Sequence, residues 1–91
     1  MASTVLFINH PEKECGVHQF GESVYRAIKA SSVYHFIYCE CSTADALQAC
    51  INEHKPVAVI YNYYPSTMPW LNPGLTRSIA IPHIGVIHEV T

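Results

Sequence analysis

The chain has 91 residues, enough for one small domain, spanning residues 1–91, with a single core. Hydrophobic residues make up 49% of it and charged residues 13%, a composition that excludes a disordered chain. The formal net charge is −2 with histidine counted as neutral, so we expect no nucleic-acid partner and no electrostatic binding to an anionic membrane.

The longest apolar runs are about as long as a strand, far short of the roughly 20 residues that span a bilayer, so no transmembrane segment is expected. The N-terminal M-A-S-T-V lacks a basic region followed by a long apolar one, which predicts no secretory signal. Four cysteines would permit two disulfides, but Cys39 and Cys50 lie inside apolar periodic segments. We therefore expect reduced thiols in a cytoplasmic protein.

In chain order, the first predicted strand covers residues 4–9 and contains the continuous apolar run V-L-F-I, typical of a strand buried on both faces. The turn N-H-P-E-K-E-C-G-V-H-Q-F-G leads into a helix predicted over residues 17–31, because apolar residues recur there at helical spacing. A helix N-terminus exposes unpaired N–H groups, and Gly16 lets an anion approach the backbone closely. This turn is therefore the first candidate ligand site.

The second predicted strand covers residues 34–39. A capping box at Ser42 and Asp45 predicts the start of a second helix, which ends before Lys55-Pro56. The third predicted strand, residues 57–62, is again a continuous apolar run. A turn is expected at residues 68–71, and Asn72-Pro73 predicts the start of a helix over residues 73–79. The fourth predicted strand covers residues 83–88.

The order β-α-β-α-β-α-β predicts an α/β fold: a three-layer, Rossmann-like half domain with a four-stranded parallel sheet and right-handed crossovers. The expected strand order is 3-2-1-4, which places the first two helices on one face and the third on the other. Part of the second face should then be bare. Apolar area left in water costs roughly 25 cal/mol per Å². We therefore expect another copy, or a domain outside these residues, to cover it, and a homo-oligomer is the expected state.

His88 and Glu89 end the last predicted strand, and the carboxyl ends of parallel strands line the ligand crevice of an open sheet. A neutral histidine there can form a hydrogen bond with a sugar hydroxyl, and Glu89 can accept a hydrogen bond from such a hydroxyl. The alternative is a solvent-facing strand end. In the order 3-2-1-4, His10 lies beside the fourth strand, so His10 and His88 are expected to face one cavity. Backbone N–H groups near Gly16 and Val17 are the candidate phosphate or sugar contacts, and a plain tight turn is the alternative.

The end of the third strand is unusually aromatic, with Tyr61, Tyr63, Tyr64 and Trp70. Aromatic faces stack on sugars and bases. Packing of these rings under the proline-rich loop is nevertheless the favoured interpretation, because large rings bury well once their polar atoms are satisfied.

The close pairs Cys15-x-x-His18 and Cys39-x-Cys41 do not have the spacing of a zinc site, and a second pair is missing. Cys15 near a helix N-terminus is conceivable as a redox or catalytic thiol, but no base partner is visible. No metal and no cofactor are therefore predicted.

The stretch V-L-F-I-N-H-P-E-K-E-C-G-V-H-Q-F-G-E-S-V-Y-R-A-I resembles the opening of retaining glycosyltransferases with the two-domain GT-B fold. K-P-V-A-V-I-Y-N-Y-Y-P is similar to their following strand, and I-P-H-I-G-V-I-H-E to the strand that ends in His-Asp or His-Glu. The resemblance covers nearly the whole chain.

In that family the N-terminal domain mainly binds the acceptor, the C-terminal domain holds the nucleotide-sugar donor, and catalysis occurs between them. The resemblance places Gly16 near the donor diphosphate and the catalytic His88 near the transferred sugar. The other substrate-binding candidates are Val17, His10, Glu89 and Tyr64. The donor domain with its paired glutamates is absent from these 91 residues. The chain is therefore expected to be inactive alone, and to act in a complete enzyme that moves a sugar from a nucleotide-diphosphate sugar to an unknown acceptor.

Two alternatives belong to other classes. One is a non-catalytic Rossmann-like or flavodoxin-like interaction module that dimerises through its uncovered sheet face. The other is a small nucleotide-binding or flavin-binding domain.

Overall fold

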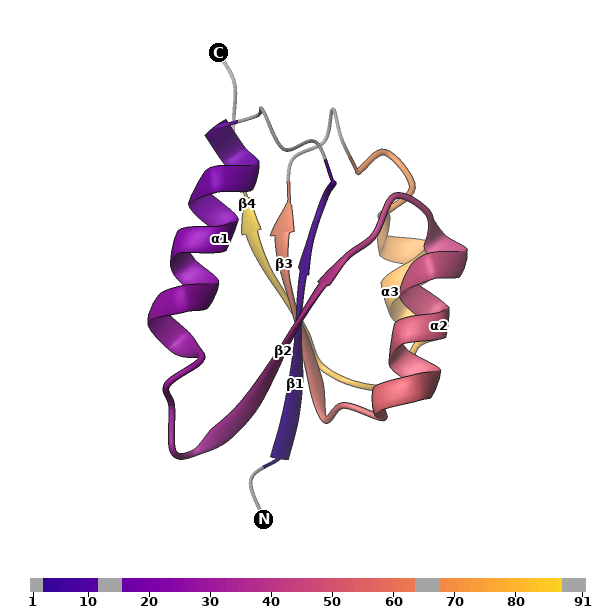
Figure 1. The fold of residues 1–91 in the computed structure, drawn as a ribbon. Helices are drawn as coiled ribbons and strands as arrows, with labels where there is room; N and C mark the ends of the chain where they lie inside the picture. The colour runs from indigo at the N-terminus through magenta and orange to yellow at the C-terminus, as the bar shows by residue number, and fades with distance from the viewer. Residues whose placement is uncertain (1–2, 12–15, 64–67, 88–91) are drawn as a thin grey trace.

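The computed structural model describes residues 3–11, 16–63 and 68–87. Strands and helices alternate along the chain (Figure 1). The elements are β1 (Ser3–Asn9), α1 (Gly16–Ile28), β2 (Tyr34–Glu40), α2 (Ala44–His54), β3 (Ala58–Tyr63), α3 (Pro73–Ser78) and β4 (His83–Ile87). The predicted order of elements is thus confirmed, with bounds that differ by at most three residues.

The four strands form one parallel sheet, which confirms the predicted α/β class. Their order is 2-1-3-4, so the predicted order 3-2-1-4 is wrong. The two continuous apolar runs, β1 and β3, lie side by side in the middle, where both faces of a strand can be covered. Strand β2 contains no fully buried residue and lies at an edge.

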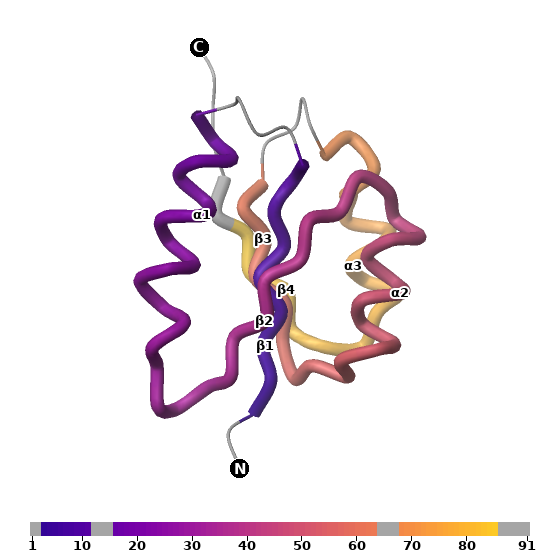
Figure 2. Tube along the Cα trace, in the orientation of Figure 1, coloured from indigo at the N-terminus to yellow at the C-terminus, as the bar shows by residue number. Residues whose placement is uncertain are grey.

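The strand order decides which face each helix covers. The chain moves outward from β1 to β2 and then back past β1 to β3, and right-handed crossovers in opposite directions place their helices on opposite faces. Helix α1 therefore lies alone on one face, and α2 and α3 lie on the other (Figure 1). Figure 2 traces these crossovers along the chain. The expectation that the first two helices share a face is wrong for the same reason.

The helix ends follow local sequence signals. The side chain of Thr43, and not the predicted Ser42, caps α2 by accepting a hydrogen bond from the Ala46 N–H. Lys55 ends α2 in the left-handed conformation, with φ 48°. Asn72 caps α3 and Pro73 is its first residue, as predicted.

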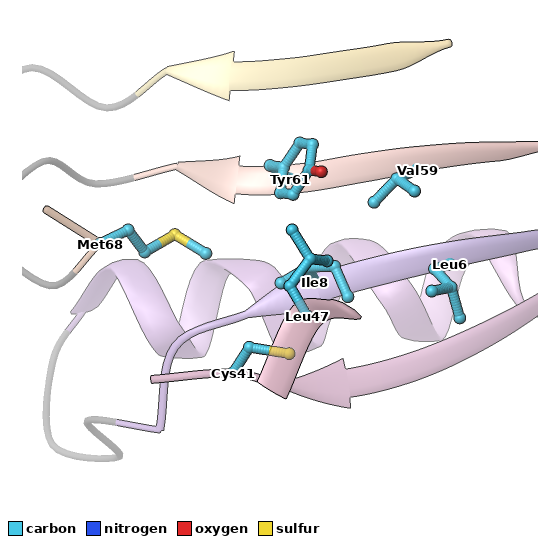
Figure 3. Packing of buried hydrophobic residues seen from close by; sticks show 7 residues of the cluster. All are labelled: Leu6, Ile8, Cys41, Leu47, Val59, Tyr61 and Met68. Carbon is cyan, nitrogen blue, oxygen red and sulfur yellow. The ribbon is translucent and has the colours of Figure 1, made fainter. Parts of the chain in front are cut away.

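The main core lies between the sheet and the helices α2 and α3. Figure 3 shows its buried side chains, which come from both central strands, from α2 and from the segments that follow β2 and precede α3. They are Leu6, Ile8, Cys41, Leu47, Val59, Tyr61 and Met68. Because side chains alternate along a strand, Val5, Phe7 and Asn9 point to the α1 face instead.

One helix covers the α1 face only in part. Exposed apolar side chains there include Ile84 (54%) and Val57 (48%). They border a groove of about 340 Å³ that runs across the sheet beside α1. Its lining residues are Val5, Tyr34, Phe36, Val57, Ala58, Ile60 and Ile84. A bare apolar face is thus present as expected, but it lies on the side of the first helix and not of the third.

Candidate functional site

The carboxyl ends of β1 and β3 are joined by two buried asparagines. Asn62 Nδ2 donates hydrogen bonds to Asn9 Oδ1 (3.0 Å) and to the carbonyl of Val17 (2.7 Å). Asn9 Nδ2 donates to the carbonyl of His18 (3.1 Å). The two side chains therefore fasten the first turn of α1 to the two central strands.

Helix α1 approaches these asparagines closely because residue 21 is a glycine. A Cβ atom at Gly21 would lie 2.4 Å from Asn62 Nδ2 and 2.7 Å from Asn9 Nδ2, too near for any side chain. Glycine is unfavourable inside a helix by about 1 kcal/mol relative to alanine. Its presence here is explained by the close approach of helix and sheet.

A polar network extends from Asn9 to the edge strand β2. Asn9 Nδ2 donates to the Tyr38 hydroxyl (3.0 Å), which donates to Glu40 Oε2 (2.7 Å). The buried His18 places Nε2 2.6 Å from the same Glu40 oxygen and Nδ1 3.2 Å from Glu22 Oε1. Burial is the main cause, and the hydrogen bond to Glu40 a further one, of a raised pKa for the Tyr38 hydroxyl, which favours its donating, neutral form.

The network lies at the topological switch point of the sheet. The chain leaves β1 toward β2 in one direction and reaches β3 in the other, so the crevice between the carboxyl ends of β1 and β3 is the expected ligand position of such a fold. Helix α1 begins at this edge (Figure 1) and offers N–H groups without helical partners. The side chains of Glu40 and Glu22 keep 25% and 47% of their surface exposed, so their carboxylates can accept hydrogen bonds from a ligand.

The structure places three of the predicted site residues near this edge. Gly16 is exposed and is the first residue of α1, and a Cβ there would meet nothing within 4 Å. Val17 is half-buried, and its carbonyl is held by Asn62. His10 directly follows β1 and is fully buried, with its ring 5.8 Å from that of His18.

The other predicted site residues, Tyr64, His88 and Glu89, lie outside the described residues, as does Cys15. The prediction that His10 lies beside the fourth strand is wrong, because β3 lies between β1 and β4. The aromatic residues at the end of the third strand have different positions. Tyr61 is buried in the main core, whereas Trp70 is half-buried and packs against that core.

Sequence reasoning missed the asparagines, Tyr38 and the pair His18–Glu40. A signal for the asparagines was present, because Asn9 and Asn62 each interrupt an otherwise apolar strand near its carboxyl end. A buried amide must find hydrogen-bond partners, so two such residues on parallel strands suggest a shared network. No comparable signal marks Tyr38, because its role depends on which strand pairs with β1.

Three thiols gather on the opposite side of the sheet. Cys39, Cys41 and Cys50 are free, and burial together with the neighbouring Cys50 raises the pKa of Cys39 and Cys41 to about 12. These thiols are therefore protonated and weakly nucleophilic at neutral pH. Among the described residues, no group of three or more His, Cys, Asp or Glu side chains is arranged to hold a metal ion.

Comparisons of the chain with protein-family models, with curated proteins and with solved structures found no match. Within residues 3–11, 16–63 and 68–87, none of the helices is both long and apolar enough to cross a membrane.

Proposed function

We propose that the chain is the acceptor-side half domain of a sugar-transferring enzyme, and that it binds a hydroxyl-rich ligand at the carboxyl edge of β1 and β3. The observation that carries the proposal is the clamp formed by Asn9 and Asn62, which holds the start of α1 at the switch point. A rigid N-terminus there offers donors, and the carboxylates of Glu22 and Glu40 offer acceptors.

The charge at this edge favours an acceptor over the donor diphosphate. Two carboxylates flank His18, and a diphosphate beside them would meet like charge. A neutral sugar hydroxyl can instead donate to either carboxylate and accept from a helix N–H. In the complete enzyme, a separate domain would supply the nucleotide sugar. We also propose that this enzyme is located in the cytoplasm.

Thermal unfolding with added ligand tests the proposal. A ligand that binds only the folded chain stabilises it by RT ln(1 + [L]/Kd), so glucose or mannose at about 100 mM should raise Tm if their Kd is on the order of 1–10 mM. Glu40→Gln removes an acceptor charge and should reduce that ligand-induced shift, whereas Asp45→Asn, on the exposed first turn of α2, should leave it unchanged.

Equal Tm shifts in both variants, or none in the wild type, would contradict the proposal. A shift with flavin mononucleotide but not with sugars would favour the alternative of a flavin-binding domain, because FMN binds at the same switch point in flavodoxin-like sheets.

A second candidate function, homodimerisation through the α1 face, is favoured by the apolar groove beside α1. The groove carries two aromatic side chains, Tyr34 and Phe36, and none of the described residues that line it is charged. Aromatic residues in uncharged patches are typical of interface centres. Burying the groove against its copy would remove from water the apolar area that the single helix leaves exposed.

Sedimentation equilibrium tests this second proposal. At about 0.5 mM the wild type should sediment as twice the 10.2 kDa chain. Ile84→Glu adds a charge at a side chain that is 54% exposed, so the variant should fold and be monomeric. Asn52→Glu, on the exposed surface of α2, is the matched control and should remain dimeric. A monomeric wild type, or an Ile84→Glu dimer, would overturn the proposal.

A further inference from the structure

A second cavity lies on the other face of the sheet, between α3 and the strands β3 and β4. Its volume is about 360 Å³, within the range of small-molecule sites. We propose that this cavity binds a small, uncharged, aromatic compound carrying one hydroxyl or carbonyl group. The cavity lies on the α3 face of the sheet, opposite the face that carries Asn9 and Glu40. The proposal therefore does not depend on the sugar-binding proposal.

The cavity exists because β4 carries a glycine opposite a tyrosine. Gly85 pairs with Tyr61 in the parallel ladder and lies two residues from His83, so it occupies the same face of β4 as His83. A side chain at residue 85 would project under α3. Glycine weakens a strand. A glycine inside a strand often marks a place where another group approaches the backbone closely.

The wall of the cavity is a fixed pair of rings. Tyr61 and His83 stack with centroids 5.6 Å apart and planes 12° apart. His83 Nε2 lies 3.3 Å from the carbonyl oxygen of Ile79, which can only accept, so Nε2 carries the hydrogen. His83 Nδ1 then accepts the hydrogen bond from the Tyr61 hydroxyl (2.7 Å). Both rings are thereby locked in place before a ligand arrives, which lowers the entropic cost of binding.

The chemistry of the lining selects the ligand. None of the described residues that line the cavity has a formal charge at neutral pH when His83 is neutral, and Leu71 and Pro73 add apolar surface. Asn72 Oδ1 accepts from the Leu75 N–H, and Thr76 Oγ1 donates to the Pro73 carbonyl. A charged or polyhydroxylated ligand would therefore lose more hydration than the cavity returns.

The hydroxyl of Tyr63 can serve a ligand. Within the described part of the chain, the hydroxyl of the half-buried Tyr63 makes no hydrogen bond, and Tyr63 lines the cavity. It can donate to, or accept from, a single polar atom on the ligand. An aromatic ring with one such atom matches the combination of stacking surface, volume and lone hydroxyl.

Amide NMR spectra of the ¹⁵N-labelled chain test the proposal with 4-methylphenol, toluene and glucose as probes. We expect 4-methylphenol to shift the amide signals of Thr76, His83 and Gly85 saturably, with a Kd on the order of 1 mM. Toluene should bind more weakly, and glucose should leave these signals unchanged. No saturable shift with 4-methylphenol up to about 10 mM, or a shift of these signals by glucose at that concentration, would overturn the proposal.

Two variants locate the binding. Gly85→Leu fills the cavity and replaces glycine by a better strand former, so it should fold and lose 4-methylphenol binding at least tenfold. Ile84→Val, on the opposite face of β4, is the control and should bind as the wild type does. If Gly85→Leu does not fold, Tyr63→Phe decides: it should weaken 4-methylphenol about 3–10-fold and leave toluene unchanged. Unchanged 4-methylphenol affinity in Gly85→Leu, or in Tyr63→Phe, would contradict the assignment.

Discussion

Asn62 Nδ2 donates a hydrogen bond of 3.0 Å to Asn9 Oδ1, and both side chains are buried between the sheet and α1. The two residues are 53 positions apart in the chain, and the contact requires β1 and β3 to be neighbours. The same pair holds the carbonyls of Val17 and His18. One interaction thus links the strand order to the position of the helix at the proposed binding edge.

Replacing Asn62 by alanine should destabilise the fold. The change removes the hydrogen bonds to Asn9 Oδ1 and to the Val17 carbonyl, each worth about 0.5–1.5 kcal/mol, although Asn9 Oδ1 still accepts from the His10 N–H. Urea denaturation should show a loss of about 1–3 kcal/mol in the free energy of unfolding. Asn52→Ala, on the exposed side of α2, is the control and should change it by less than about 0.5 kcal/mol. Similar losses in the two variants would show that the network contributes little.

The two glycines of α1 should respond oppositely to alanine. Gly21→Ala places a methyl group 2.4 Å from Asn62 Nδ2, so either the helix or the two buried asparagine side chains must shift, at a cost of about 1–3 kcal/mol. Gly16→Ala meets nothing within 4 Å and should be neutral or stabilising by up to about 1 kcal/mol. Thermal unfolding of both variants measures the difference. A Gly21→Ala protein as stable as the Gly16→Ala protein would contradict the close packing of α1.

The two tyrosines of β2, Tyr34 and Tyr38, provide a matched pair. Tyr38→Phe removes the hydroxyl that accepts from Asn9 and donates to Glu40, and should cost about 1–2 kcal/mol in urea denaturation. Tyr34 is 45% exposed, so Tyr34→Phe should cost less than about 0.5 kcal/mol. Equal effects would mean that the Tyr38 hydroxyl is not part of a structural network.

Stability should fall at alkaline pH because of the buried thiols. Burial raises the pKa of Cys39 and Cys41 from 9.0 to about 12, so these thiols ionise more readily in the unfolded chain than in the folded one. Their stabilising contribution is complete below pH 9 and decreases as the pH rises toward 12. Urea denaturation between pH 8 and 11 should therefore show a smaller decline for the double variant Cys39→Ala/Cys41→Ala than for the wild type. Parallel declines in the two proteins would contradict the raised pKa values.

The sequence predicted the elements of this fold better than their arrangement. Apolar runs, caps and prolines are local signals, and they located β1, β3 and the start of α3 correctly. Strand order depends on long-range pairing, which no local pattern encodes. The one long-range signal was the pair of asparagines: a polar residue near the end of each apolar run favours neighbouring strands, because each amide needs a buried partner.

The candidate site shows the same division. Gly16 and Val17 were predicted from the position of a helix N-terminus, a local feature, and they lie at the carboxyl edge. His18, Tyr38 and Glu40 come from two elements whose contact is set by packing. Their hydrogen bonds could be found only once β2 was paired with β1.

An amide NMR titration of the ¹⁵N-labelled wild type with a neutral sugar tests sugar binding at the start of α1. We expect saturable shifts of the Gly16, Val17 and His18 amide signals with glucose or mannose, while the amides of α3 stay unchanged. No shift at the start of α1 up to about 100 mM sugar, or shifts confined to other elements, would contradict sugar binding at the carboxyl edge of β1 and β3.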